Sequence, residues 1–93
     1  MTRLTRDSSL RRCKDVVFSR VEDESVLLSF AKERYYGLNE VGTRAWELLG
    51  EHGRLSDVAQ HVAREFEVSP ETAETDVLQL AAELLAAGLV EEM

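Results

Sequence analysis

The sequence has one cysteine, one proline and no long hydrophobic run. A single cysteine cannot form an internal disulfide, so Cys13 excludes a disulfide-stabilised fold and is typical of a reducing compartment. The N-terminal stretch MTRLTRDSSLRR is charged and lacks the apolar run of a secretory signal. We therefore expect a cytoplasmic protein with no membrane partner.

Signatures of catalysis are also lacking. His52 and His61 are the only histidines, and no cysteine or third histidine accompanies them at metal-ligand spacing. The sequence contains no GxGxxG, GxxxxGK[ST] or GxSxG motif. Its many carboxylates are scattered over helix faces that the pattern predicts to be exposed. We therefore expect no enzymatic activity, no cofactor and no metal.

Charge is abundant but mostly of one sign, with 18 acidic against 11 basic residues and a net charge of −7. Residues 1–15 hold five of the basic residues and only two acidic ones, which leaves the remainder strongly acidic. Such a field opposes a phosphate backbone, so no nucleic-acid partner is expected. We interpret residues 1–13 as a flexible basic segment, solvated or in contact with an acidic partner, and residues 14–93 as one folded domain.

Between Lys14 and Leu38 the apolar residues follow the period of β-strands. The segments KDVVFSRVE, ESVLLSFA and RYYGL predict three short strands, and the acidic residues 22–24 form a polar turn between the first two. Short connections favour an antiparallel meander.

After Leu38 the period becomes helical. Asn39 is a good N-cap for a first helix, and Gly50 and Gly53 are expected to end it. Trp46 borders the apolar stripe of this helix and is expected in the core. With two more helices behind it, the chain predicts an α+β fold, a three-stranded meander followed by three helices in a winged-helix-like arrangement.

The second and third helices have clear boundary signals. The second is expected from Ser56 to near Val68. The pair Ser69 and Pro70 is a strong start signal for the third, which runs to about Ala87 with Gly88 just beyond its end.

The third helix carries apolar residues on more than one stripe, because Leu78 and Leu85 lie well round from the main one. Two interpretations stay open. Both arcs could be buried in the domain's own core, or one flank could line a groove for another chain.

A helix-turn-helix interpretation is a weaker alternative. The third helix would be the recognition helix of a winged-helix DNA-binding protein. Its exposed positions include Glu71, Glu74, Asp76 and Glu83, whereas base-reading helices depend on Arg, Lys, Asn and Gln. The carboxylates disfavour this function.

Two segments resemble a known family. The stretch RYYGLNEVGTRAWELL, residues 34–49, is similar to the strand-to-helix junction of PqqD-like domains, also called precursor-peptide recognition elements. The stretch LSDVAQHVAREFEVSPETAETDVLQLAAELLAAGLV is similar to their second and third helices, including Asp76 and Val77 and the closing Gly88, Leu89 and Val90. The resemblance covers about residues 14–90.

This resemblance implies a non-catalytic domain that binds the leader segment of a ribosomally made precursor peptide. The leader would add as a strand beside the third strand, with side chains entering the groove between that strand and the third helix. Strand alternation places Arg34, Tyr36 and Leu38 on one face and Tyr35 on the other, and does not decide which tyrosine faces the groove. The expected peptide-binding residues are Glu33, Arg34, Tyr35, Tyr36, Gly37, Leu38, Asp76, Val77, Gln79, Leu80, Glu83 and Leu84.

The resemblance also allows a choice of subtype. Members from pyrroloquinoline quinone biosynthesis, which act as chaperones for a radical SAM enzyme, usually carry Pro-Glu after the second strand and Cys-Asp-Gly at the end of the first helix. Here those places read AKE and LGE. The tyrosine-rich strand and Trp46 look more like the stand-alone leader-binding proteins of lasso-peptide clusters, which implies a leader peptidase or another modifying enzyme as partner. An open edge strand also allows either a monomer or a weak edge-mediated dimer.

Overall fold

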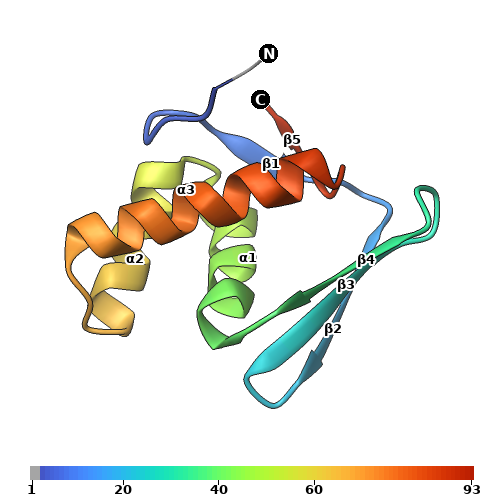
Figure 1. The fold of residues 1–93 in the computed structure, drawn as a ribbon, viewed down its shortest axis with the longest axis horizontal. Coiled ribbons are helices and arrows are strands. Elements are labelled where there is room, and N and C mark those ends of the chain that lie inside the picture. The colour runs from blue at the N-terminus through green and yellow to red at the C-terminus, as the bar shows by residue number, and fades with distance from the viewer. Residues whose placement is uncertain (1–2) are drawn as a thin grey trace.

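The computed structural model describes residues 3–93 and shows a three-stranded antiparallel sheet followed by three helices, with a short strand at each end (Figure 1). The predicted α+β class and the order of the meander and helices are confirmed. The elements are β1 (Leu10–Arg12), β2 (Val16–Val21), β3 (Glu24–Ser29), β4 (Arg34–Leu38), α1 (Glu40–His52), α2 (Leu55–Glu65), α3 (Pro70–Ala86) and β5 (Val90–Glu92).

Two of the helix starts follow the sequence signals. The side chain of Asn39 accepts a hydrogen bond from the amide of Gly42 at 2.8 Å and caps α1. The hydroxyl of Ser69 accepts one from the amide of Thr72 at 3.1 Å and caps α3, with Pro70 in its first turn. Each cap satisfies an amide that has no partner inside the helix.

Other boundaries differ from the expectation. α1 continues through Gly50 and ends only at Gly53, whose φ of 75° leaves the helical region. One interior glycine costs a helix only about 1 kcal/mol, which packing overrides. α2 begins one residue early, at Leu55, and ends at Glu65, short of Val68.

The end of α3 shows why Gly88 stands there. Gly88 has a φ of 76°, and its amide donates to the carbonyl of Leu85 at 3.1 Å. The amide of Leu89 donates to the carbonyl of Leu84 at 3.0 Å. This pair of bonds is a Schellman motif, which favours glycine because a Cβ is strained at positive φ.

The N-terminal segment differs most from the expectation, because its end is part of the fold. Leu10–Arg12 pair antiparallel with Val90–Glu92, and the side chain of Leu10 is fully buried. The carbonyl of Ser8 also accepts a hydrogen bond from the amide of Leu55 at 3.0 Å. Residues 10–12 therefore belong to the packed domain and not to a flexible segment. Two strands of three residues each are too short to show a period in the sequence. Met1 and Thr2 lie outside the described residues.

The core lies mainly among the three helices and includes Trp46, as expected. The sheet extends away from the helices, and only its inner face contributes to the core, through Leu27 and Leu38 (Figure 1). A buried hydrogen bond of 2.8 Å between the hydroxyls of Ser25 and Thr43 joins this inner face to α1. Within residues 3–93, no helix is both long enough and apolar enough to cross a bilayer.

Candidate peptide-binding site

A groove of about 370 Å³ lies between β4 and α3. The last three residues of β4 form one side, one flank of α3 forms the other, and the start of α1 closes the bottom. Its lining comprises Tyr36, Gly37, Leu38, Asn39, Val41, Gly42, Ala45, Asp76, Val77, Gln79, Leu80 and Glu83.

The backbone of the sheet determines which groups are free beside this groove. Val21 pairs with Glu24 across a two-residue loop, so the two must exchange both of their backbone hydrogen bonds. Hydrogen-bonded and non-hydrogen-bonded pairs alternate along an antiparallel ladder. Ser25, Leu27 and Ser29 therefore direct their N–H and C=O groups away from β2 and toward β4.

The same alternation continues into β4, which among residues 3–93 pairs with β3 alone. Leu38, Tyr36 and Arg34 are the partners of those three β3 residues, so their backbone groups face β3. The N–H and C=O groups of Tyr35 and Gly37 consequently face the open edge. An extended segment could pair with this edge while its inward side chains entered the groove.

The wall on α3 is a stripe of polar and apolar residues next to the helix face that packs into the core. Asp76, Leu80 and Glu83 are spaced by four and three residues, which places them on one side of the helix. Val77 lies between this stripe and the core. Leu84, which was expected in the groove wall, is fully buried in the core because it lies one helical repeat of seven residues beyond Val77.

The bottom of the groove comes from α1 and was not anticipated. Val41 is half-buried there, and Ala45 is buried. A Cβ on Gly42 would lie 3.1 Å from a methyl carbon of Leu38, so the absence of a side chain lets α1 approach the end of β4 closely. The sequence placed Val41 and Ala45 on the apolar stripe of the first helix, which predicted burial but not a place in the groove.

The two tyrosines have opposite environments. Tyr36 is half-buried against the core and its hydroxyl donates a hydrogen bond to the carboxylate of Glu83, which ties β4 to α3 across the groove. This hydrogen bond, together with some burial and the negative charge of Glu83, raises the pKa of Tyr36 to about 12. Tyr35 is 78% exposed on the other face of the sheet. Tyr36 is therefore the tyrosine of the groove.

The structure brings most of the expected site residues together. Glu33, Arg34 and Tyr35 do not line the groove and are exposed along the outer part of the β4 edge and its turn. Eight of the twelve expected residues line it, namely Tyr36, Gly37, Leu38, Asp76, Val77, Gln79, Leu80 and Glu83.

Comparisons with known proteins identify the family of this fold. The family model described as coenzyme PQQ synthesis protein D (PqqD) matches residues 24–90. The chain belongs to the PqqD family. The match runs from β3 to the start of β5 and so includes both walls of the groove in this PqqD-family domain. Comparison with curated proteins gives no match.

Two solved structures are similar to this PqqD-family domain over nearly their whole length. TbiB1, solved in complex with the TbiA(beta) leader peptide, is 32% identical, with a TM-score of 0.80 over 87% of this chain and 94% of that one. A lasso peptide synthetase B1, solved with its leader peptide, is 25% identical, with a TM-score of 0.77 over 89% of this chain and 98% of that one. Both similar structures are thus complexes with a leader peptide.

Proposed function

We propose that this domain binds the leader segment of a ribosomally made precursor peptide by strand addition to β4. The observation that carries this proposal is the free edge of β4, with the backbone groups of Tyr35 and Gly37 turned outward beside the groove. Edge pairing provides affinity that does not depend on sequence, and the groove provides specificity for alternate side chains. The leader complexes of the two similar structures support this proposal.

The domain itself performs no bond chemistry in this proposal. It holds the precursor in the cytoplasm and raises its local concentration near a modifying enzyme, for which we favour the leader peptidase of a lasso-peptide pathway. A role in pyrroloquinoline quinone synthesis has support only at the level of the family. Incubation of the domain alone with full-length precursor, followed by mass spectrometry, should leave the precursor mass unchanged. A cleaved or modified precursor would contradict the non-catalytic role.

Calorimetric titration with the leader encoded beside this chain's own gene tests the binding. We expect a dissociation constant between about 10 nM and 10 μM, or roughly −11 to −7 kcal/mol. Tyr35→Pro should weaken binding about tenfold, because proline removes one outward amide and restrains the strand. Tyr35→Ala is the matched control, because it removes the exposed ring but keeps the amide, and it should bind more tightly than the proline variant. A folded Tyr35→Pro domain that binds the leader with unchanged affinity would rule out strand addition.

The same edge could instead pair with a second copy of the domain. Sedimentation with increasing protein concentration should detect such a dimer. Leader peptide should dissociate it if both use the β4 edge. A dimer that persists at saturating leader would show that the dimer and the leader use different surfaces.

A further inference from the structure

The two ends of β4 differ in the charged groups that stand beside them. Beyond the Leu38 end, a second hollow of about 790 Å³ surrounds the β2–β3 turn and shares Gly37, Leu38 and Asn39 with the groove. We call the carboxylates around this end the acidic end. It comprises Glu22, Asp23, Glu24 and Glu40 of the second hollow and Asp76 of the groove wall.

The acidic end is not neutralised by the domain itself. Within the part of the chain that the structure describes, none of its five carboxylates forms an ion pair. The nearest cation in sequence, Arg20, is paired with Glu47 and donates to the backbone carbonyl of Glu22. The N-terminus of α1 adds only about half a positive charge, which Asn39 already caps. Several negative charges therefore remain beside Leu38.

The opposite end of β4 carries two cations. Lys32 lies in the turn before β4, and its ammonium group donates to the carbonyl of Gly88 at the end of α3. Arg34 begins β4. We call Lys32 and Arg34 the basic end. Neither forms an ion pair within residues 3–93. The carboxylates near them are Glu33 of the same turn and Glu83, which accepts the hydrogen bond of the Tyr36 hydroxyl.

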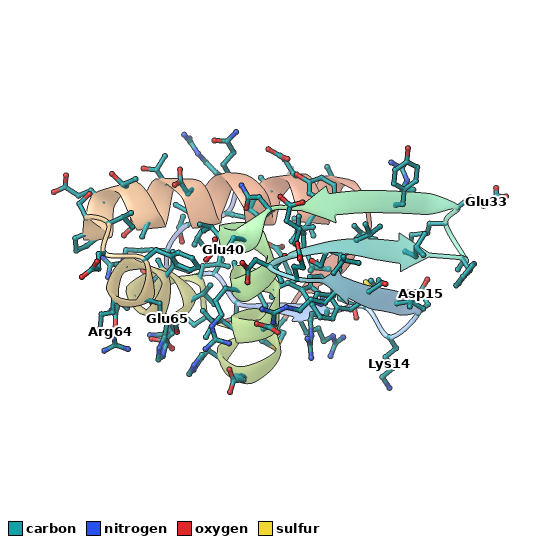
Figure 2. The ribbon with its side chains drawn as sticks, turned by 90° about the horizontal axis from the view of Figure 1, so that it is seen from below. Lys14, Asp15, Glu33, Glu40, Arg64 and Glu65 are labelled. Atoms are coloured by element: carbon teal, nitrogen blue, oxygen red, sulfur yellow. The ribbon has the colours of Figure 1, made fainter. Side chains whose placement is uncertain are left out.

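The acidic end and the basic end are separated by about the length of β4. β4 has five residues and spans about 13 Å. Figure 2 shows Glu40 at the inner end of this strand and Glu33 at its outer end. Charges about 13 Å apart are screened from each other at moderate salt, because the Debye length is about 10 Å at 0.1 M, so each end acts on what lies next to it.

From this arrangement we infer that the occupant of the groove is an extended peptide with a definite charge order. Basic side chains lie beside Leu38 and Asp76, and acidic side chains lie beside Lys32 and Arg34. Because antiparallel pairing is the more stable, the peptide runs opposite to β4. The basic part then precedes the acidic part in the peptide sequence. This inference rests on the proposed function and specifies the class of leader that the same site selects.

Two charge-swapped probes test the inference. Both are the leader encoded beside this chain's gene, one with a Lys-Lys pair added at the N-terminal end of its strand-forming segment and a Glu-Glu pair at the C-terminal end, the other with the pairs exchanged. At low salt we expect the lysine-first peptide to bind about fivefold more tightly, because exposed ion pairs each contribute only modestly. In about 1 M NaCl, where the Debye length is about 3 Å, the preference should disappear.

A pair of double variants locates the effect. Glu40→Gln with Asp76→Asn removes two charges from the acidic end and should reduce the lysine-first preference to about twofold. Glu51→Gln with Glu92→Gln removes two exposed carboxylates that line neither the groove nor the second hollow and should keep the full preference. Circular dichroism checks that both variants fold.

The outcomes separate the two proposals. Equal affinities for the two peptides, or a glutamate-first preference, overturn the charge order while leaving strand addition standing. A preference lost equally in both double variants also overturns it, because net charge alone would then be responsible. If the unmodified leader does not bind, the proposed function itself fails and the charge order fails with it.

Discussion

The helices and the three-stranded sheet differ in how much of the core they supply. Of the 18 buried apolar residues within residues 3–93, 13 lie on α1, α2 and α3 and only two lie on β2, β3 and β4. The outer face of the sheet leaves Val17 and Val26 exposed to 45% and 40%. The difference teaches that the helices supply most of the core that stabilises the fold, whereas the sheet presents the open edge of β4.

The largest expected effect tests this difference directly. Leu84→Ala should destabilise the domain by about 2–5 kcal/mol, because it leaves a cavity among packed helices. Val17→Ala, on the exposed face of β2, should cost less than about 1 kcal/mol. Urea unfolding followed by circular dichroism measures both. Similar losses in the two variants would show that the sheet and helices contribute alike.

A smaller effect concerns the buried hydrogen bond that joins the sheet to α1. Thr43→Val leaves the buried hydroxyl of Ser25 without its partner and should cost about 1–3 kcal/mol. Ser25→Ala should cost less, because the Thr43 hydroxyl can still donate to the carbonyl of Leu38. The double variant should be more stable than Thr43→Val alone. A Ser25→Ala variant that is the less stable of the two single variants would contradict this account of the joint.

The smallest effect is a pH dependence of stability that arises from the Tyr36–Glu83 hydrogen bond across the groove. The pKa of Tyr36 is raised to about 12 in the folded domain, above the usual value of about 10. The neutral phenol is therefore favoured by folding, and its contribution to stability is present below pH 10 and lost as pH rises from about 10 to 12. In a Tyr35→Phe background, ultraviolet titration reports Tyr36 alone. Adding Glu83→Gln should lower its pKa toward 10, and an unchanged value would remove Glu83 as the cause.

Local signals predicted most of the fold. The caps at Asn39 and Ser69 and the alternation in the three central strands depend on neighbouring residues, so the sequence displays them. β1 and β5 escaped prediction because they pair across almost the whole chain and have only three residues each. Such short strands show no hydrophobic period in the sequence, and their long-range pairing gives no local signal.

The site was predictable to the extent that it depends on local elements. β4 and the α3 stripe were predicted as its walls, but the packing of the elements against one another decided the rest. Leu84 was expected in the groove and lies in the core, whereas Val41 and Ala45 of α1 form the bottom of the groove. Which tyrosine faces inward also depended on register, and Tyr36 takes that position because it pairs with the buried Leu27.

Amide hydrogen exchange, followed residue by residue by nuclear magnetic resonance with and without the leader, tests the central claim most directly. In the free domain the amides of Tyr35 and Gly37 face the open edge and should exchange quickly, whereas the amide of Tyr36 faces β3 and should be protected. Saturating leader should slow amide exchange at Tyr35 and Gly37, and the amide of Tyr36 should stay protected. A saturated domain in which Tyr35 and Gly37 exchange as fast as before would contradict strand addition at β4.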